Sequence, residues 1–249
     1  MTTKFKLTVA LFAAAVAGAP LAAQTAANAQ ARKDPTASTT TAGKDGWVQL
    51  FNGQDLTGWR GYKKADATGT RWKVEDGLLV LDPGTGQDTR GARDIVTTET
   101  FDNFDLRWEW KISQGGNSGV KYFVLEDEAS AIGHEYQIIE EGRHARAKIG
   151  PHRQTGAFYD VLQAADRAIK PAGEWKVSEV RAHGTHVEHW LNGKKILAYE
   201  LDSPALREAI AKSKFKDNKR FGKRQKGHIL IQDHGNQVWY RKVEIKRVK

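Results

Sequence analysis

Apolar and polar residues alternate along much of the chain beyond residue 46. The clearest example is segment 104–112, in which five apolar residues alternate with four charged ones. A period of two is typical of a β-strand that buries one face. We therefore expect a strand over 104–112, with Trp108 and Trp110 on its buried face and in the core.

Shorter segments repeat this alternation and indicate further strands. Asn192-Gly193 lies between two alternating runs and is the strongest short signal for a tight hairpin. A turn at 233–236 separates the last two runs. The additional strands are expected over 78–81, 120–124, 135–139, 187–191, 195–199, 229–231 and 238–245.

One segment, 203–213, has helical spacing instead. Ser203 suits the N-cap, Pro204 suits the first helical position, and Leu206 and Ile210 fall on one face. The many short strands, joined by turns rich in Gly, Asn and Asp, lack any βαβ alternation or internal repeat. They predict an all-β fold, an antiparallel β-sandwich or jelly roll with one short helix near 203–213.

The first 29 residues have the layout of a secretory signal peptide. Lys4 and Lys6 give a positive start, an apolar run follows over 7–19, and residues 27–29 form a small-x-small cleavage site. An alternative exit follows Ala23. The apolar run is too short to span a bilayer. We therefore expect export to the periplasm or the outside, without membrane insertion.

The sequence after this signal divides into two parts. Residues 30–45 are small and polar, which is typical of a flexible leader. The folded part is expected to be one β-sandwich domain over 46–249, a length that a single all-β domain can absorb.

Composition narrows the chemistry. The chain has no Cys, which excludes thiolate catalysis, Cys-based zinc sites and iron–sulfur clusters. Its net charge is +9, from 39 Lys and Arg against 30 Asp and Glu, and it falls to +7 when Lys4 and Lys6 leave with the signal peptide. Segment 207–226 alone carries nine basic and two acidic residues.

This basic segment has two readings. It could bind nucleic acid through phosphate contacts and stacking. Export argues against a nucleic-acid partner, and we expect instead a solvated loop near a polar or anionic ligand. Phe215 and Phe221 are expected to hold the loop onto the body of the domain.

Three segments, 115–121, 133–137 and 232–235, place polar residues where strand patterns expect a core. Burying a polar group costs free energy unless it is paired, so a ligand cleft is one explanation. A hydrogen-bonded core network or a plain turn is the other. Ordinary turn chemistry is favoured at 115–119. Asp233-His234 is open between a turn, an acid–base pair and metal ligands, with the turn slightly favoured.

Residues Glu135, Gln137 and Glu140 offer a different reading. Laminarinase-type sugar hydrolases carry an E-x-D-x-x-E strand in which a bulge brings both Glu side chains to one face. Here Gln137 takes the middle position. Without a bulge, Glu135 and Glu140 point to opposite faces, so this reading depends on one.

Taken together, seven segments resemble the 3-keto-disaccharide hydrolase family, whose fold is similar to concanavalin-like jelly rolls. The resemblance runs from Gly46 to Val248, nearly the whole mature chain. The segments, in order, are GWVQLFNGQDLTGWRGY, WKVEDGLLVL, GGNSGVKYF, GHEYQIIEE, TGAFYDV, GEWKVSEVRAHGTHVEHWLNGKKI and GHILIQDHGNQVWYRKVEIK.

The resemblance implies an enzyme that cleaves 3-keto-glycosides. A base removes the hydrogen on carbon 2, the group on carbon 1 leaves by β-elimination, and water adds back. The resemblance implies no definite cofactor, and a divalent metal held by carboxylate and His ligands could polarise the ketone instead. The partner expected is a small carbohydrate substrate.

The resemblance also implies roles for particular residues. Lys121 stands where many family members are expected to carry Arg, and a Lys acts there as a point charge instead of a bidentate donor. The candidates are Glu135 and His134 as bases, Asn117 and Lys121 at the oxygen on carbon 3, Asp233 and His234 for acid help or positioning, and Gln137 and Tyr159 as substrate contacts.

Two alternatives to this enzyme stay open on the sequence. The first is a non-catalytic carbohydrate-binding module on the same fold, because a fold does not decide a function. The second is a retaining glycosidase that uses Glu135 and Glu140 on unoxidised glycosides.

Overall fold

The computed structural model describes residues 45–83 and 94–249. The expected signal peptide, 1–29, and leader residues 30–44 lie outside these residues and stay predictions. Within the described part of the chain, no helix combines the length and the apolar character needed to cross a membrane.

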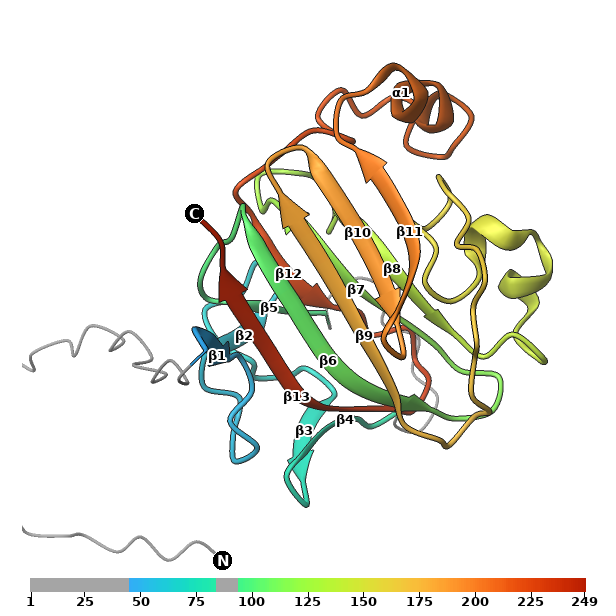
Figure 1. Cartoon of the computed structure of the whole chain (residues 1–249). Coiled ribbons are helices and arrows are strands. Elements are labelled where there is room, and N and C mark those ends of the chain that lie inside the picture. The colour runs from blue at the N-terminus through green and yellow to red at the C-terminus, as the bar shows by residue number, and fades with distance from the viewer. Residues whose placement is uncertain (1–44, 84–93) are drawn as a thin grey trace, which may run out of the picture. The chain divides into compact units, whose positions relative to one another are not determined.

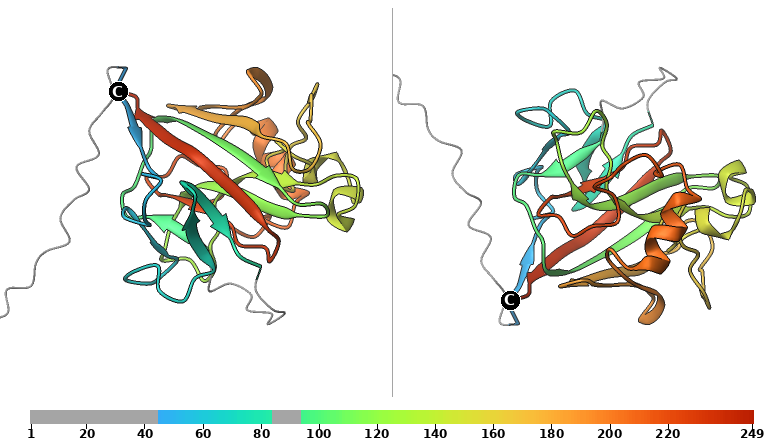
Figure 2. Two further views of the ribbon diagram at one scale, coloured as in Figure 1. Left: turned by 90° about the horizontal axis from the view of Figure 1, so that it is seen from below. Right: turned by 90° about the horizontal axis from the view of Figure 1, so that it is seen from above.

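The strands of the described residues form two antiparallel sheets that pack face to face (Figures 1 and 2). The larger sheet has the order β11 (Lys194–Glu200), β10 (His186–Leu191), β9 (Lys176–His183), β6 (Phe104–Ile112), β13 (Val238–Arg247), β4 (Leu78–Leu81), β3 (Trp72–Glu75), with β1 (Trp47–Gln49) also on β13. The smaller has the order β2 (Trp59–Gly61), β5 (Ile95–Thr97), β12 (His228–Ile231), β7 (Asn117–Val124), β8 (His134–Ile139).

The core lies between these sheets, and β6 shows how the sequence builds it. Every second residue of β6 is buried, and the residues between are half-buried. Trp108 and Trp110 are 1% and 0% exposed, which confirms their place in the core. The two sheets confirm the predicted all-β antiparallel sandwich of the jelly-roll class.

The local turn and cap signals also hold. Asn192 and Gly193 join β10 to β11, and both have positive φ, as a two-residue hairpin of this kind requires. Helix α1 (Pro204–Ala211) begins after Ser203, whose side chain accepts a 3.2 Å hydrogen bond from the Leu206 N–H. Two short 3₁₀ helices, η1 (Ala145–Lys148) and η2 (Pro151–Arg153), were not anticipated.

The link between the last two strands has a different role from a hairpin turn. Strand β12 belongs to the smaller sheet, whereas β13 runs beside β6 in the larger one. Residues 232–237 therefore pass from one sheet to the other. This crossing leaves Gln232 at the end of β12, beside the neighbouring strand β7, where its N–H bonds to the Gly119 carbonyl.

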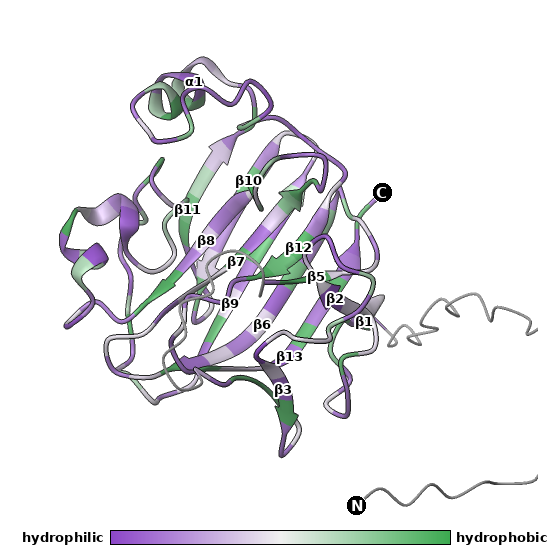
Figure 3. Cartoon of the chain, turned by 180° about the vertical axis from the view of Figure 1, so that it is seen from behind, coloured by the Kyte–Doolittle hydropathy of each residue, from purple (hydrophilic) through white to green (hydrophobic). Residues whose placement is uncertain are grey.

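The register of β7 with β8 shows which residues lie on each face of the smaller sheet. Tyr122 lies opposite His134 on the face toward the core, and Lys121 lies opposite Glu135 on the outer face. Along β6, where buried and half-buried residues alternate, Figure 3 shows hydrophilic positions between paler or hydrophobic ones. The outer face also carries a small apolar cluster of Tyr62, Val96, Val124 and Leu230.

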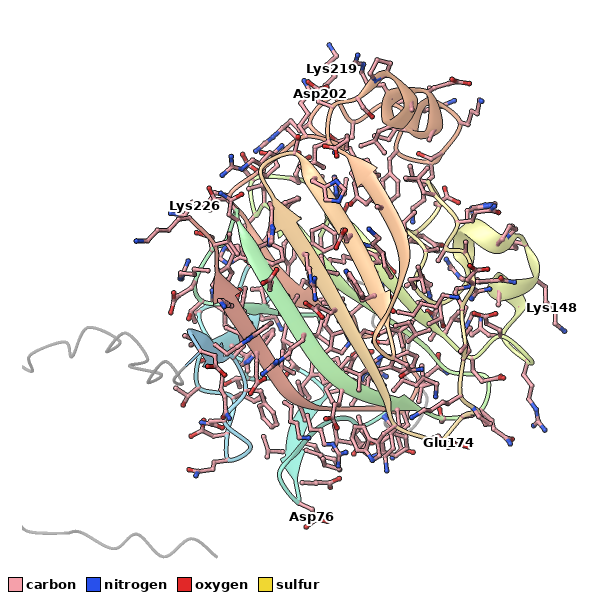
Figure 4. All side chains as sticks on the ribbon, viewed as in Figure 1. Asp76, Lys148, Glu174, Asp202, Lys219 and Lys226 are labelled. Atoms are coloured by element: carbon pink, nitrogen blue, oxygen red, sulfur yellow. The ribbon has the colours of Figure 1, made fainter. Side chains whose placement is uncertain are left out.

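The basic segment 207–226 spans most of α1 and the loop after it. Phe221 is buried and stacks on Phe215 at 4.0 Å, so the expected anchoring by the two Phe residues is confirmed. In Figure 4 the labelled Lys219 and Lys226 side chains point outward from the body. Other basic residues pair with carboxylates, namely Lys212 with Glu208, Arg220 with Asp127 and Arg224 with Asp102.

Candidate functional site

A cleft of about 730 Å³ opens on the outer face of the smaller sheet. Its floor comes from β7, β8 and the ends of β5 and β12, and its walls come from the loops after β2, β7 and α1. Polar and charged side chains dominate the described lining: Lys63, Lys64, Asp94, Lys121, Ser130, Glu135, Lys214 and Gln232, beside Tyr62 and Phe215.

Glu135 is the carboxylate at the centre of this floor. The residue is 5% exposed, and the Lys121 ammonium on the neighbouring strand lies 3.8 Å from its Oε2. Burial raises the pKa of the Glu135 carboxyl above its usual value, while the charge of Lys121 opposes this shift. A buried carboxylate with an elevated pKa, beside a cation, is a candidate for proton transfer.

A glycine makes room for this carboxylate. Gly119 lies next to Glu135 across the β7–β8 ladder, on the same outer face. A Cβ at this position would lie 2.7 Å from the Glu135 Oε1, closer than real Cβ contacts, and 3.0 Å from its Cγ, tighter than most. The absence of a side chain at Gly119 therefore lets Glu135 lie across the strand.

Asp94, at the start of β5, joins this group and was not predicted. Burial raises the pKa of its carboxyl, and the charge of Lys121 counters that shift. Its Oδ1 accepts a 2.8 Å hydrogen bond from the Asp233 N–H. Lys121 thus interacts electrostatically with two buried carboxylates at once.

Lys214 is the second site residue that sequence reasoning missed. Lys214 belongs to the basic segment 207–226, and nothing in the sequence distinguished it from the other basic residues there. In the structure it lines the cleft. Its backbone N–H donates to Asp160 Oδ2 at 2.9 Å, and its Nζ lies 4.3 Å from the centre of the Tyr159 ring. The only signal available was the expectation that this loop lies near a polar or anionic ligand.

The three other predicted contact residues, Asn117, Gln137 and Tyr159, lie outside the described cleft lining and pair within the protein. Gln137 shares the outer face with Glu135, and its Nε2 donates to Asn117 Oδ1 at 2.7 Å. The Tyr159 hydroxyl accepts a 3.2 Å hydrogen bond from Arg146. Its ring makes a cation–π contact with the Lys214 ammonium. Of the three, Tyr159 contacts a lining residue, Lys214.

His134 lies on the opposite face of β8 from Glu135, inside the core, with 2% exposure. Its Nε2 accepts a 3.1 Å hydrogen bond from the Gly222 N–H, so the ring proton must sit on Nδ1. That Nδ1 lies 3.0 Å from the Tyr199 hydroxyl and donates to it. Burial lowers the pKa of His134 to about 3, which keeps the ring neutral.

The hydrogen-bond chain continues from Tyr199 across the core. The Tyr199 and Tyr122 hydroxyls lie 2.6 Å apart, and the Tyr122 hydroxyl lies 2.8 Å from His189 Nε2. His189 Nδ1 ends the chain 2.8 Å from the Gly156 carbonyl, which can only accept. A backbone donor at one end and a backbone acceptor at the other therefore fix the direction of every bond.

The predicted pair Asp233 and His234 does not meet in the cleft. The Asp233 carboxylate forms a two-point ion pair with Arg71, at 2.8 Å from its Nε, and its side chain is 1% exposed. The His234 ring instead packs edge to face against the His144 ring, with the ring centres 5.8 Å apart. Burial, with the nearby Arg146 charge, lowers the pKa of His234.

Glu140 also lies outside the cleft lining. It follows the end of β8, and its carboxylate accepts three backbone hydrogen bonds, from Gly115, Gly142 and Arg143. The register of β7 with β8 shows no bulge. The bulge that a two-carboxylate glycosidase strand needs is therefore absent here.

Residues 46–246 match the family described as the 3-keto-alpha-glucoside-1,2-lyase-like domain. The chain belongs to this family. A 3-keto-disaccharide hydrolase of Bacteroides thetaiotaomicron is 33% identical over 229 residues, which cover 81% of this chain and 78% of that protein. The family resemblance found in the sequence is thereby confirmed.

Two solved structures from Parabacteroides distasonis, both described as candidate glycosyl hydrolases, share this fold. The first has a TM-score of 0.74 and 32% identity, and the match covers 82% of this chain and 95% of that one. The second has a TM-score of 0.64 and 25% identity, and the match covers 81% of this chain and 99% of that one.

A metal site was left open by the sequence of this family member. Within residues 45–83 and 94–249, no three His, Asp or Glu side chains come together as a group that could hold a metal ion. Among the described residues, the carboxylates that line the cleft are Asp94 and Glu135. No ligand set is therefore assigned.

Gly119→Ala tests how Glu135 is held. The new Cβ should push the carboxylate toward the solvent of the cleft and so bring its pKa down toward the ordinary value. A nuclear magnetic resonance titration of the Glu135 carboxyl measures this change. Gly142→Ala is the control, because its Cβ would lie 2.8 Å from the Glu140 carboxylate instead. An unchanged Glu135 titration in Gly119→Ala would contradict the packing argument.

The two buried His residues predict how stability depends on pH. Burial lowers the pKa of His134 to about 3 and that of His189 to about 4, below about 6.5 in the unfolded chain. The unfolded state therefore binds more protons below pH 6.5, and stability is lost as pH falls toward 4. Each His contributes up to about 1.4 kcal/mol per pH unit in that window.

Denaturant unfolding from pH 7 to pH 4.5 measures this slope. His134→Gln should reduce the slope of unfolding free energy against pH by the contribution of about one proton. This holds even if the variant is less stable at every pH. Tyr136→Phe is the control: it removes a buried hydroxyl whose raised pKa keeps it protonated over this range, so it should lower stability and keep the native slope. Equal slopes in the native chain and His134→Gln would show that His134 binds a proton in the folded state.

Proposed function

We propose that the chain is a carbohydrate-active enzyme that cleaves the glycosidic bond of 3-keto-glycosides, including 3-keto-disaccharides. The observation that carries this proposal is the buried Glu135 carboxylate beside the Lys121 ammonium, in a cleft of about 730 Å³. That volume suits a small-molecule ligand. Family membership and the relative named a 3-keto-disaccharide hydrolase support the substrate class.

Glu135 is assigned as the base. A ketone at carbon 3 acidifies the hydrogen on carbon 2, because the charge left by its removal spreads onto the ketone oxygen. The raised pKa makes the Glu135 carboxylate a stronger base than it is in water. It takes the proton from carbon 2, and an enediolate remains.

Lys121 is assigned to the oxygen on carbon 3. Its ammonium lies beside the base and lines the cleft, so it can stabilise the negative charge as that charge develops. Asn117 was predicted for the same oxygen, but its amide oxygen accepts from Gln137. We therefore give Asn117 and Gln137 a supporting role beside the base, on the same face of the sheet.

The other predicted catalytic residues take no step in this proposal. His134 faces the core, and Asp233 is committed to Arg71. His234 contacts His144 and lies outside the cleft lining. Their proposed functions are positional: His134 holds Gly222, and Asp233 holds the crossing between the sheets and donates its N–H to Asp94.

Elimination follows from the enediolate. The oxygen on carbon 3 regains its double bond, a double bond forms between carbons 1 and 2, and the carbon 1–oxygen bond breaks with its electron pair. The departing oxygen takes up a proton. Water then adds to carbon 1 while Glu135 returns a proton to carbon 2. The sum is hydrolysis without a pair of opposed carboxylates.

A paired turnover assay tests the function. Purified protein is given a 3-keto-glucoside and its unoxidised parent, with and without EDTA, and released sugar is followed by mass spectrometry. We expect release from the keto-glycoside alone. Release from the parent would favour a two-carboxylate glycosidase, and release from neither would favour a carbohydrate-binding module. Loss of turnover in EDTA would reveal a metal requirement.

Glu135→Gln tests the base. Removal of the base should lower kcat on the keto-glycoside by about 10²-fold or more. In the native enzyme kcat should fall at acid pH, with a midpoint above the ordinary Glu value, because protonated Glu135 cannot accept a proton. Glu140→Gln is the control and should retain turnover per folded molecule. Full activity in a folded Glu135→Gln variant would remove Glu135 as the base.

We also propose export of this enzyme, on the basis of the signal-like residues 1–29. N-terminal sequencing of the protein from the periplasm or culture medium should find a chain that begins at residue 30. A chain recovered from the cytoplasm with residues 1–29 attached would refute it.

A further inference from the structure

The elimination step needs a proton donor for the departing oxygen, and the residues predicted for it lie elsewhere. A sugar hydroxyl is a poor leaving group unless it is protonated as its bond to carbon 1 breaks. The donor must therefore line the same cleft as Glu135 and carry a proton that is free to move.

Most proton-bearing groups of the described lining are already engaged. Lys121 Nζ donates to the Ala131 carbonyl at 3.0 Å and sits against the base. The Tyr62 hydroxyl donates to the Leu125 carbonyl at 3.2 Å, and burial raises its pKa to about 12. Lys63 Nζ donates to the Glu128 carbonyl at 2.6 Å.

Lys214 lines the cleft and differs from these groups because its backbone is fixed while its Nζ makes no hydrogen bond to the described residues. Its N–H bonds to Asp160 Oδ2 at 2.9 Å, and Asp160 is held by Arg153 at 2.6 Å from its Oδ1. The Nζ lies 4.3 Å from the centre of the Tyr159 ring and 4.8 Å from that of Phe215. Aromatic faces attract an ammonium without taking its proton.

The loop that carries Lys214 is itself anchored at its base. The Asp202 N–H donates to the Gly222 carbonyl at 2.9 Å, and the Gly222 N–H donates to His134. Phe221 packs against the His134 ring at 5.1 Å. The buried hydrogen-bond chain from His134 thus fixes the loop from which Lys214 enters the cleft.

We propose that Lys214 is the catalytic acid that protonates the departing glycosidic oxygen. This inference rests on the proposed function. As the carbon 1–oxygen bond breaks, its electron pair takes the proton from Lys214 Nζ, which becomes a neutral amine. When water adds to carbon 1, that amine accepts the proton that the water loses. Lys214 returns to the ammonium form, and the protons balance over the cycle.

The surroundings favour this exchange. Desolvation lowers the pKa of Lys214 below its ordinary value, while Glu135 and Asp160 favour the charged form. An ammonium with a lowered pKa gives up its proton more readily and still recovers it from water. The same carboxylate that acts as the base therefore helps to keep the acid charged before the reaction.

Lys214→Met tests the role through its dependence on the leaving group. A 3-keto-disaccharide releases a sugar alkoxide that needs a proton, whereas a 4-nitrophenyl 3-keto-glucoside releases a stable anion that does not. We expect kcat on the disaccharide to fall by about 10²–10⁴-fold and kcat on the nitrophenyl substrate by less than about 10-fold. Lys216→Met, an exposed change two residues away, should alter neither.

Exchange of the hydrogen on carbon 2 separates this inference from the proposed function. In D₂O, Lys214→Met should still exchange that hydrogen, because Glu135 acts before the acid. Equal losses on both substrates, or unchanged kcat on both, would overturn the role of Lys214 alone. The same leaving-group pattern in Asp94→Asn, with none in Lys214→Met, would transfer the role to Asp94. A native enzyme that neither exchanges nor cleaves would overturn both proposals.

Discussion

The register between β7 and β8 is the constraint on which both the core and the site depend. It places Lys121 opposite Glu135 on the outer face and Tyr122 opposite His134 on the inner one. A slip of β8 by one residue would reverse its two faces, because side chains alternate with a period of two. The Glu135 carboxylate would then enter the core, and His134 would leave its hydrogen-bond chain for the outer face. One pair of strands therefore carries both the stability of the sandwich and the geometry of the cleft.

Features that depend on residues close together in the sequence were predicted correctly. The alternation predicted the buried face of β6, Asn192-Gly193 predicted the hairpin, and Ser203 predicted the start of α1. The same rule could have placed His134 correctly, since neighbours in a strand point to opposite faces and cannot both serve one cleft with Glu135. The family resemblance, not the strand rule, brought His134 in as a second base.

Other parts of the site depend on contacts between residues far apart in the chain, which no local pattern contains. Asp233 reads as half of an acid–base dipeptide, yet its carboxylate is taken by Arg71, 162 residues away. Lys214 reads as one of nine basic residues in a solvated segment, and it reaches the cleft only because Phe215 and Phe221 pack their loop down. Nothing in the local sequence marks Asp94 as a site residue. It lines the cleft because β5, which it precedes, pairs with β12.

His134 and Glu135, neighbours in β8, are both buried, but their polar atoms differ in how fully they are hydrogen-bonded. This difference indicates a function at Glu135. In the core, each bond of the chain from Gly222 to Gly156 has a donor, an acceptor and a fixed direction. At the cleft, Glu135 is equally buried but meets Lys121 only at 3.8 Å, beyond hydrogen-bond range. A buried carboxylate so weakly compensated costs stability, and a neutral residue would pack there more cheaply. A buried carboxylate that faces a cleft, with its nearest cation beyond hydrogen-bond range, is best explained by a ligand that completes its contacts.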